Sequence, residues 1–258
     1  MRILWIFAHP ESLSLSGALR DDGLRALDRL GHEHRSSDMY AMKWKPTVDA
    51  DDFSRHEPDE PLVVTAASRH AHRTGTLSAD IRAEQAKLDW ADAVVLQFPL
   101  WWYGMPAILK GWFDRVFVKG FAYGVTDPAD RRRTLRYGEG RLTGKRGLVV
   151  VTAGSPRPAL GPRGINGQID QVLFPLLHGT LWYTGMSVLS PHVVHGADRI
   201  GTAEYDVAAA RLRDRLVSLE HEEPIPYRFQ NGGDYDDDLV LRADVAPGAT
   251  GLAAHYAG

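Results

Sequence analysis

The 258-residue sequence contains no cysteine. This absence excludes disulfide bonds and thiol catalysis, and it leaves a flavin or a metal as routes to redox chemistry. No apolar run approaches the length needed to span a membrane, and no charged and apolar leader pattern precedes the first apolar run. We therefore expect a cytoplasmic protein without a membrane span. The formal net charge of −3 gives no reason to expect a nucleic acid or an anionic membrane as a partner.

Two common nucleotide-binding patterns are also missing near the start of the chain. Residues 3–8 form a continuous apolar run, which predicts a buried parallel strand, and the segment 9–17 after it matches neither G-x-G-x-x-G nor a P-loop. This segment instead carries Ser12, Ser14 and Ser16, and an amphipathic helix follows it and ends at Gly31. Backbone N–H groups and the helix dipole at such a position favour a phosphate. The alternative interpretation is that the serines only cap the helix.

The stretch around which the chain is organised is residues 93–117. Residues 93–96 are apolar and rich in β-branched side chains, which predicts a strand buried on both faces that ends at Pro99. Three consecutive aromatic residues, 101–103, come next, and Pro106 fits the first turn of a helix that continues to residue 117. An aromatic loop at the carboxyl end of a parallel strand is suited to a flat ligand. The alternative is that the aromatic side chains pack in the core or in an interface.

The rest of the sequence completes an alternation of strands and helices. We expect a second strand at 32–37, a helix at 78–91, a strand at 148–152, a helix at 168–177, a short strand at 188–189 and a last helix at 203–219. Five strand–helix alternations predict an α/β fold with a doubly wound five-stranded parallel sheet of flavodoxin-like order 2-1-3-4-5. We expect one domain over residues 1–222. Residues 223–258, with a predicted strand at 239–241, form a non-helical tail packed on this domain or on a partner subunit.

Two clusters of polar residues resemble metal sites but are better explained otherwise. His70 and His72 lie in the polar segment 47–75 without a third ligand at useful spacing, so we expect no metal there. The acidic run 234–238 is expected to be solvated. In the predicted strand order, by contrast, the loops after strands one, three and four meet at one edge of the sheet. One suits a phosphate, one can stack on a ring, and Ala153-Gly154 is small enough to let a ring approach, which together indicate a flavin site.

Residues 97–117 resemble the flavin-contacting loop and following helix of the NAD(P)H dehydrogenase (quinone) family, whose members are flavodoxin-like quinone reductases. The segments 9–14, 38–40, 81–88 and 121–123 resemble the same family. The resemblance implies a homodimer with two sites at the interface and a ping-pong cycle, in which NAD(P)H reduces the flavin and a quinone or similar flat aromatic acceptor then takes two electrons. It also implies the residues that contact the flavin: His9, Ser14, Leu15, Ser16, Pro99, Leu100, Trp101, Trp102, Tyr103, Thr152, Ala153 and Gly154.

The acceptor slot implied by the resemblance is lined by Trp102, Tyr103, Tyr123, Gly154 and Asn166, with Tyr123 and Asn166 as the catalytic candidates. The family pairs a tyrosine with a histidine near the flavin. Here the histidine position carries Asn166, which cannot release a proton at useful pH.

The tyrosine of that family pair falls on Ala159 or Leu160, and a second pocket tyrosine falls on Val125. The loss of the pair leaves the proton donor open and allows an alternative function, a regulatory or binding subunit on the same fold, for example an accessory protein of an ion-transport system. We expect FAD as the cofactor, with FMN as second choice, because segment 47–75 and the tail offer surface for an adenosine half.

Overall fold

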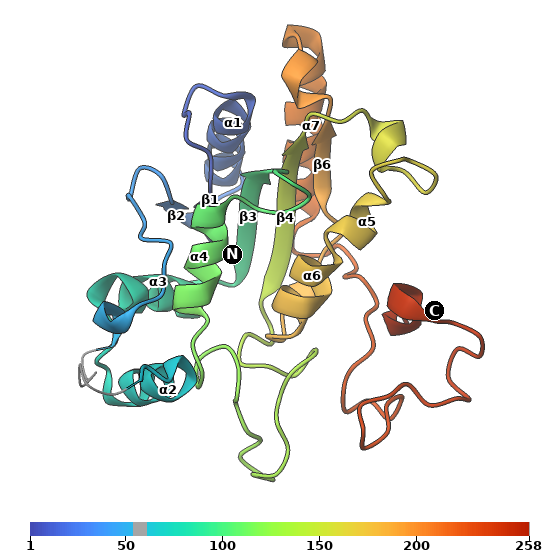
Figure 1. Cartoon of the computed structure of the whole chain (residues 1–258). Helices are drawn as coiled ribbons and strands as arrows, with labels where there is room; N and C mark the ends of the chain where they lie inside the picture. Colours follow the sequence, from blue (N-terminus) through green and yellow to red (C-terminus); the bar gives the residue numbers. More distant parts are fainter. Residues whose placement is uncertain (54–60, 258) are drawn as a thin grey trace.

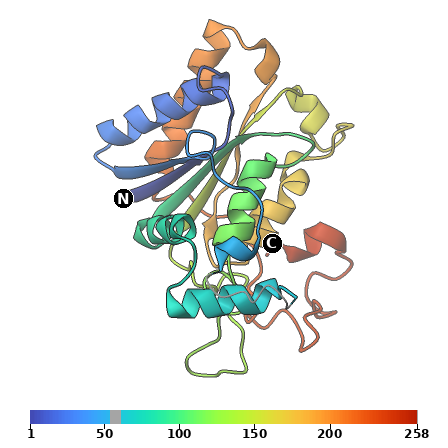
Figure 2. The ribbon, with the colours of Figure 1, turned by 60° about the vertical axis from the view of Figure 1, so that its left-hand side comes forward.

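The computed structural model describes residues 1–53 and 61–257 and contains a parallel sheet covered by helices on both faces (Figures 1 and 2). The sheet runs in the order β2-β1-β3-β4-β5. Its strands are β1 Arg2–Phe7, β2 Glu33–Asp38, β3 Ala93–Pro99, β4 Arg146–Ala153, β5 Ser187–Val188 and β6 His192–His195. The sixth strand, β6, pairs directly with residues 150–153 of β4, whereas β5 pairs with residues 146 and 147 of the same strand. The predicted order is therefore confirmed, but the predicted number of strands was one too few because β6 was missed.

The helices fall into two layers. One face of the sheet is covered by α1 (Leu15–Arg29) and α7 (Thr202–Ser218), and the other by α3 (Ala79–Trp90), α4 (Ala107–Val116) and the helical turns 169–182. Both layers bury the strands, and each residue from Ile3 to Ala8 is fully buried. Among the described residues, no helix is long and apolar enough to cross a bilayer. The sequences of β1, β3 and β4 are continuously apolar because helices pack on both faces of these strands.

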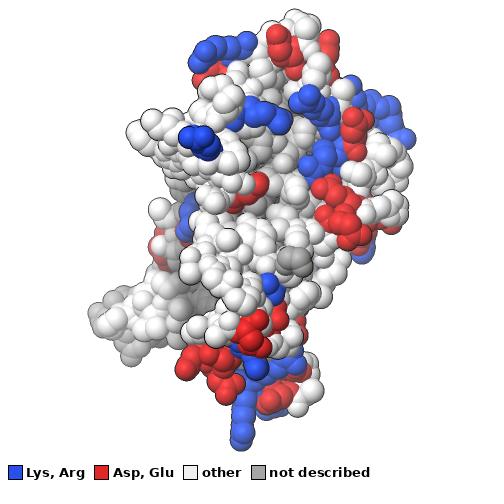
Figure 3. All heavy atoms as spheres, turned by 90° about the vertical axis from the view of Figure 1, so that its right-hand side faces the viewer, with Lys and Arg blue, Asp and Glu red and all other residues white. Residues whose placement is uncertain are grey.

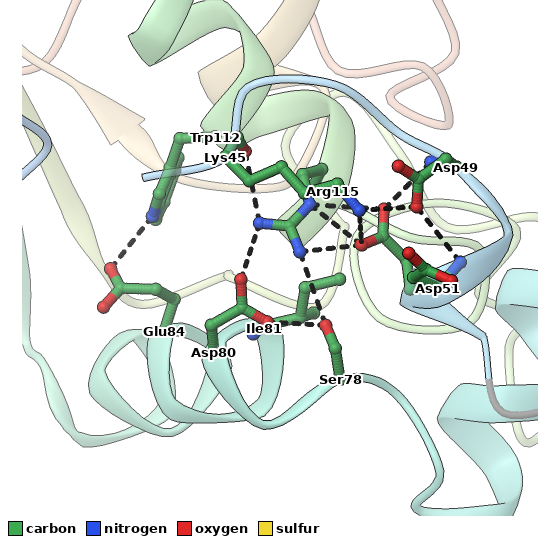
Figure 4. Close-up of polar contacts among 10 residues, drawn as sticks. Lys45, Asp49, Asp51, Ser78, Asp80, Ile81, Glu84, Trp112 and Arg115 are labelled. Carbon is green, nitrogen blue, oxygen red and sulfur yellow. Dashed lines mark hydrogen bonds and ion pairs between the residues drawn. The ribbon is translucent and has the colours of Figure 1, made fainter. Parts of the chain in front are cut away.

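Helix α4 is anchored by a buried ion pair. The Arg115 side chain is only 2% exposed and donates to Asp52 (2.7 Å) and Asp80 (2.7 Å), which belong to the η1 turn Ala50–Asp52 and to α3 (Figure 4). Trp112, one turn earlier, donates its indole N–H to Glu84 of α3 at 2.9 Å. These contacts fix the helix that follows the aromatic loop, because breaking a buried pair would leave a charge without a partner.

Two helical segments differ from the sequence prediction. The polar segment 47–75 contains a helix, α2 (Val64–Thr74), which ends at Gly75 in a left-handed conformation. Sequence patterning missed it because α2 buries only Ser68 and Ala71. The helix predicted at 168–177 is divided into α5 (Ile169–Val172), α6 (Phe174–Leu176) and a π-helical turn, Leu177–Trp182. Pro175 explains the break, since it has no N–H to continue the α5 ladder.

The tail lies beside α6 and the π-helical turn (Figure 1). Tyr227 is buried, and the Ile225 N–H donates to the Val188 carbonyl at 2.7 Å. The strand predicted at 239–241 is wrong, because Leu241 forms only an isolated bridge with Tyr235. The segment has too few neighbours to form a ladder, and one short 3₁₀ turn, Gly251–His255, follows it. The boundary between residues 222 and 223 remains our prediction.

Candidate active site

The loops after β1, β3 and β4 meet at the carboxyl edge of the sheet, as expected for neighbouring strands that run parallel. Ser16 and Thr152 bring the first and third loops together through their hydroxyls, 2.8 Å apart. Pro99 aligns with Thr152 in the register of β3 and β4, and the Leu100 N–H donates to the Thr152 carbonyl at 2.8 Å. The residues that the sequence predicted to contact a cofactor lie in these loops: His9, Ser14, Leu15 and Ser16; Pro99, Leu100, Trp101, Trp102 and Tyr103; Thr152, Ala153 and Gly154.

Gln97, on β3, contacts the first loop through its buried side chain. The sequence prediction gave this residue no role. Its side chain is fully buried and donates through Nε2 to the Ser16 carbonyl (2.7 Å), while its Oε1 accepts from the Trp5 indole N–H (2.9 Å). A buried amide with both groups satisfied fixes its neighbours, because moving them would leave a polar group unpaired. The signal was a single polar residue within an otherwise apolar strand.

The first loop is preformed around the start of α1. Ser14 is the N-cap and accepts from the Gly17 N–H at 3.1 Å, so this serine caps the helix, whether or not the loop also holds a phosphate. A Cβ on Gly17 would lie 1.9 Å from the Ser12 carbonyl oxygen, so only glycine lets the loop fold onto the helix. The N–H groups of Leu15 and Ser16 belong to the first helical turn, where no earlier carbonyl of the helix can accept them. This geometry suits an anion.

The aromatic loop has a strained backbone. Trp101 and Gly104 exchange two main-chain hydrogen bonds of 3.0 Å, and the two residues between them take left-handed conformations, with φ of 48° at Trp102 and 62° at Tyr103. Such conformations cost of order 1–2 kcal/mol each for residues with a Cβ. The Trp102 side chain is 97% exposed and Tyr103 is 53% exposed. Strain that presents apolar rings to solvent brings no gain in core packing, so it points to a ligand.

Asn166 links the aromatic loop to the loop after β4. The Tyr103 hydroxyl donates to Asn166 Oδ1 at 3.1 Å, and Asn166 Nδ2 donates to the Ser155 hydroxyl at 2.8 Å. One hydrogen on Nδ2 has no partner among the described residues, so this amide can still donate to a ligand. Gly154 precedes Ser155, and a Cβ there would lie 2.4 Å from Asp198 Oδ2, so a larger residue at this position would require the Asp198 side chain to move.

Tyr123 is not brought to these loops within one chain. It follows α4, whereas the aromatic loop precedes this 10-residue helix, which spans about 15 Å (Figure 1). Tyr123 instead lines a groove of about 420 Å³ together with residues of α2 and α4, with Phe53 after the η1 turn and with Met105, which follows the aromatic loop. Burial raises the pKa of its hydroxyl, and a hydrogen bond with Ser68 partly opposes this rise. The assigned roles of Tyr123 and Asn166 therefore remain predictions.

The residues at this edge fit a flavin on structural grounds. A helix N-terminus can hold a phosphate, two exposed aromatic side chains can support a ring, and Ser155 and Asn166 carry polar groups beside them. Among the described residues, no group of three or more His, Asp or Glu is arranged to hold a metal ion. His72, one of the two histidines considered above, packs edge-on against Phe121 with the ring centroids 5.7 Å apart.

Comparison with known proteins agrees with this architecture. A family model described as a flavodoxin-like fold matches residues 1–216. The chain is 48% identical over 257 residues to a ribosyldihydronicotinamide dehydrogenase-like protein of Penicillium crustosum, covering 99% of this chain and 95% of that protein. It is 36% identical over 228 residues to NAD(P)H dehydrogenase (quinone) 1 of Cavia porcellus, covering 87% and 79%.

A solved structure is also similar over the whole chain, including the tail. The crystal structure of a candidate quinone reductase from Klebsiella pneumoniae superposes with a TM-score of 0.96 at 50% sequence identity, and all of both chains is covered. Together with the open α/β sheet and its three converging loops, these similarities show that the chain belongs to the flavodoxin-like NAD(P)H dehydrogenase (quinone) family of oxidoreductases.

Proposed function

We propose that this protein is a flavin-dependent NAD(P)H oxidoreductase that reduces a quinone or similar flat aromatic acceptor by two electrons in a ping-pong cycle. The strained, exposed turn at Trp102 and Tyr103, beside the α1 N-terminus, is the observation that supports it most directly. A bound flavin would accept a hydride from NAD(P)H and pass it to the acceptor. The family relation and the quinone specificity named for its relatives support the same reaction.

The chain contributes binding and orientation. The first-turn N–H groups of Leu15 and Ser16 would hold a phosphate of the cofactor, with His9 beside them. His9 Nδ1 lies 3.0 Å from both the main-chain N and O of Glu11, which leaves Nε2 to face a ligand. Trp102 and Tyr103 would support the flavin ring. We propose FAD over FMN because the segment 47–75 and the tail offer surface for an adenosine half, although residues 54–60 lie outside the described residues.

Asn166 would orient the acceptor instead of protonating it. Its Oδ1 and one Nδ2 hydrogen are already engaged by Tyr103 and Ser155, so the remaining hydrogen can donate to an acceptor oxygen. An amide has no titration near neutral pH. The proton for the reduced acceptor would then come from water or from Tyr123.

Tyr123 would reach the slot from the partner subunit of a homodimer. Its distance along α4 from the aromatic loop argues against a site built by one chain alone. The groove beside it also has apolar lining, including Val64, Met105 and Phe113, and Val64 is 41% exposed. An apolar surface of this kind on a folded domain is typical of a subunit interface. A two-fold dimer would place each Tyr123 opposite the partner's aromatic loop.

The cofactor assignment can be tested directly. The purified protein should be yellow, and heat should release a flavin that co-migrates with FAD instead of FMN. Oxidation of NADH or NADPH in the presence of menadione tests the turnover. A colourless protein that neither FAD nor FMN reconstitutes would overturn the proposed function, and a bound FMN would overturn only the choice of flavin.

A further inference from the structure

A second polar groove lies away from the loops of the proposed active site. It runs between the edge strand β6 and α7, and its volume is about 560 Å³. Its lining comes from β6, from the η4 turn (Ala197–Arg199) and the residues beside it, from the flank of α7 that faces β6, and from Arg157 of the η2 turn (Arg157–Leu160). None of the lining residues is a predicted cofactor or acceptor contact.

Three arginines give the groove an excess of positive charge. Arg157, Arg199 and Arg211 are exposed, and none forms an ion pair within the parts of the chain that the structure describes. Glu204 is the one carboxylate among the lining residues. The view of this side of the molecule shows Lys and Arg side chains gathered over its upper half, with Asp and Glu among them (Figure 3).

The neighbouring arginines of α7 show the contrast. Arg213 pairs with Asp22 at 2.6 Å, and Arg215 pairs with Glu222 at 2.8 Å. On α7, Arg213 and Arg215 thus have carboxylate partners, whereas Arg211, which faces the groove, has none among the described residues. Guanidinium groups in such an arrangement match the oxygens of a phosphate, which can accept several charge-assisted hydrogen bonds at once.

Two histidines line the groove, and one ring nitrogen of each has no hydrogen-bond partner among the described residues. His192 is 8% exposed, and its Nε2 is shielded from solvent with no partner in the described structure. His195 Nδ1 is also shielded from solvent and has no hydrogen-bond partner in the described structure. Burial, helped by the charges of Arg215 and Arg211, lowers the pKa of His192 to about 4, so the ring is neutral at pH 7. The neutral His192 ring therefore adds no positive charge to the groove, which leaves the three arginines as the groups that can attract an anion.

One wall of the groove is apolar. Ile200, Ala203 and Val207 lie along it, and Val207 is 52% exposed although it is a large hydrophobic side chain. We propose that this groove binds a phosphate-bearing small organic molecule, with the phosphate held by Arg157, Arg199 and Arg211 and the organic part resting on Ile200 and Val207. The site is distinct from the proposed flavin site, although Asp198, next to Arg199, contacts Gly154 of the third loop.

Isothermal titration of the full-length protein, with whatever cofactor it carries, tests this site. The probes are inorganic pyrophosphate, adenosine 5′-monophosphate, a hexose 6-phosphate and, as the control without phosphate, adenosine. Low ionic strength is needed because salt screens exposed charges. We expect at least one phosphate compound to bind and adenosine not to bind. Arg211→Gln and Arg157→Gln should each weaken that binding about ten-fold or more, as the loss of a charge-assisted hydrogen bond implies.

Arg131→Gln is the matched control, because Arg131 is an exposed arginine outside the groove. It should change the affinity less than two-fold, while all three variants keep the thermal midpoint of the wild type. A preference for the nucleotide or for the sugar phosphate would identify the organic part. Equal weakening by Arg131→Gln, equal binding by all variants, or no binding of any phosphate compound at millimolar concentration would overturn the proposal. None of these outcomes bears on flavin binding at the other site.

Discussion

At the scale of single residues, Trp102 combines backbone strain with a side chain that is almost fully in solvent. If Trp102 supports a flavin ring, its substitution should weaken flavin binding but should not lower the free energy of unfolding of the flavin-free protein. Trp102→Asn, which tolerates the left-handed region, should leave the free energy of unfolding of the flavin-free protein unchanged or raise it by up to about 1 kcal/mol. The same variant should bind flavin about ten-fold more weakly or worse, since stacking is lost. Urea unfolding and fluorescence titration measure the two quantities.

Lys43 provides the matched control for this prediction, because it is exposed and also has a positive φ, of 50°. Lys43→Asn should relieve similar strain without changing flavin affinity. If Trp102→Asn lowered the unfolding free energy by several kcal/mol, Trp102 would have a structural role instead. Unchanged flavin affinity in that variant would remove Trp102 from the proposed site.

Asn166 allows a prediction about pH dependence. Because an amide does not titrate, the rate of acceptor reduction in the wild type should lack the ionisation near pH 6.5 that a catalytic histidine would give. Asn166→Ala removes one neutral hydrogen bond to the acceptor, worth about 0.5–1.5 kcal/mol, and should slow turnover roughly three- to ten-fold. Asn166→His should introduce a pH dependence with a midpoint near 6.5. Stopped-flow measurement of the acceptor half-reaction across the neutral range decides between these outcomes.

A thousand-fold loss in Asn166→Ala would mean that this amide does more than orient the acceptor. A clear ionisation near pH 6.5 in the wild type would mean that another histidine occupies the slot. Since the Tyr103 hydroxyl contacts Asn166, Tyr103→Phe should reproduce part of the effect of Asn166→Ala, and the double variant should be less than additive.

The residue scale also shows the limit of sequence reasoning. The loop residues could be predicted because strand ends, serines and aromatics lie next to one another in the chain. The role of Gln97 could not, because it depends on Ser16, 81 positions earlier. The contact between Tyr103 and Asn166 spans 63 positions and was equally hidden, although the sequence did place both residues in one slot.

At the scale of secondary-structure elements, α4 carries the aromatic loop and depends on one buried arginine. Arg115 and Asp52 are 2% and 1% exposed, so neither charge can turn to solvent if its partner is removed. Arg115→Met should lower the free energy of unfolding by about 3–5 kcal/mol, mainly because Asp52 remains buried with Lys45 as its remaining cationic contact. Thermal or urea unfolding measures this loss.

The same helix offers a control, the Lys110–Asp114 pair, whose side chains are 60% and 46% exposed. Lys110→Met should lower the unfolding free energy by less than about 0.5 kcal/mol, as expected for an exposed pair one helical turn apart. Similar losses in both variants would show that Arg115 does not anchor α4.

The Arg115 contacts also predict an acid dependence. Burial alone would raise the pKa of Asp80, but hydrogen bonds from Arg115 and Ser78 outweigh burial and hold this pKa below its usual value of 3.8. A depressed carboxyl pKa contributes stability above pH 4 that is lost as the pH falls through the lower, folded-state value. The unfolding free energy of Asp80→Asn should therefore fall less steeply than that of the wild type below about pH 4.

The elements that the sequence missed have weak local patterns. Strand β6 begins four residues after β5 ends and is only four residues long, so the sequence prediction found the strand at 188–189 and missed β6. Helix α2 has few large apolar residues and buries only Ser68 and Ala71, and Pro175 divides the helix predicted at 168–177. By contrast, the strands buried on both faces were predictable, because their apolar runs reflect burial that does not depend on distant partners.

At the scale of the whole molecule, the proposal that Trp102 and Tyr123 share one active site requires two chains. Sedimentation at micromolar concentration should give twice the chain mass of 28.6 kDa. Mass alone does not show how the residues are shared, since a dimer could still have each site within one chain. The arrangement of Trp102 and Tyr123 at opposite ends of α4 makes the stronger prediction that each site takes one residue from each subunit.

Complementation between two inactive variants tests this arrangement. Trp102→Ala and Tyr123→Ala homodimers should each turn over slowly, because both of their sites carry a substitution. When equal amounts of the two variants are unfolded and refolded together, about half of the dimers should be mixed, and one of the two sites in each mixed dimer should be unaltered. Activity should then recover to about a quarter of the wild-type value. If each site belongs to one chain, every site in the mixed dimers carries one substitution, and mixing will restore nothing above the mean of the two variants.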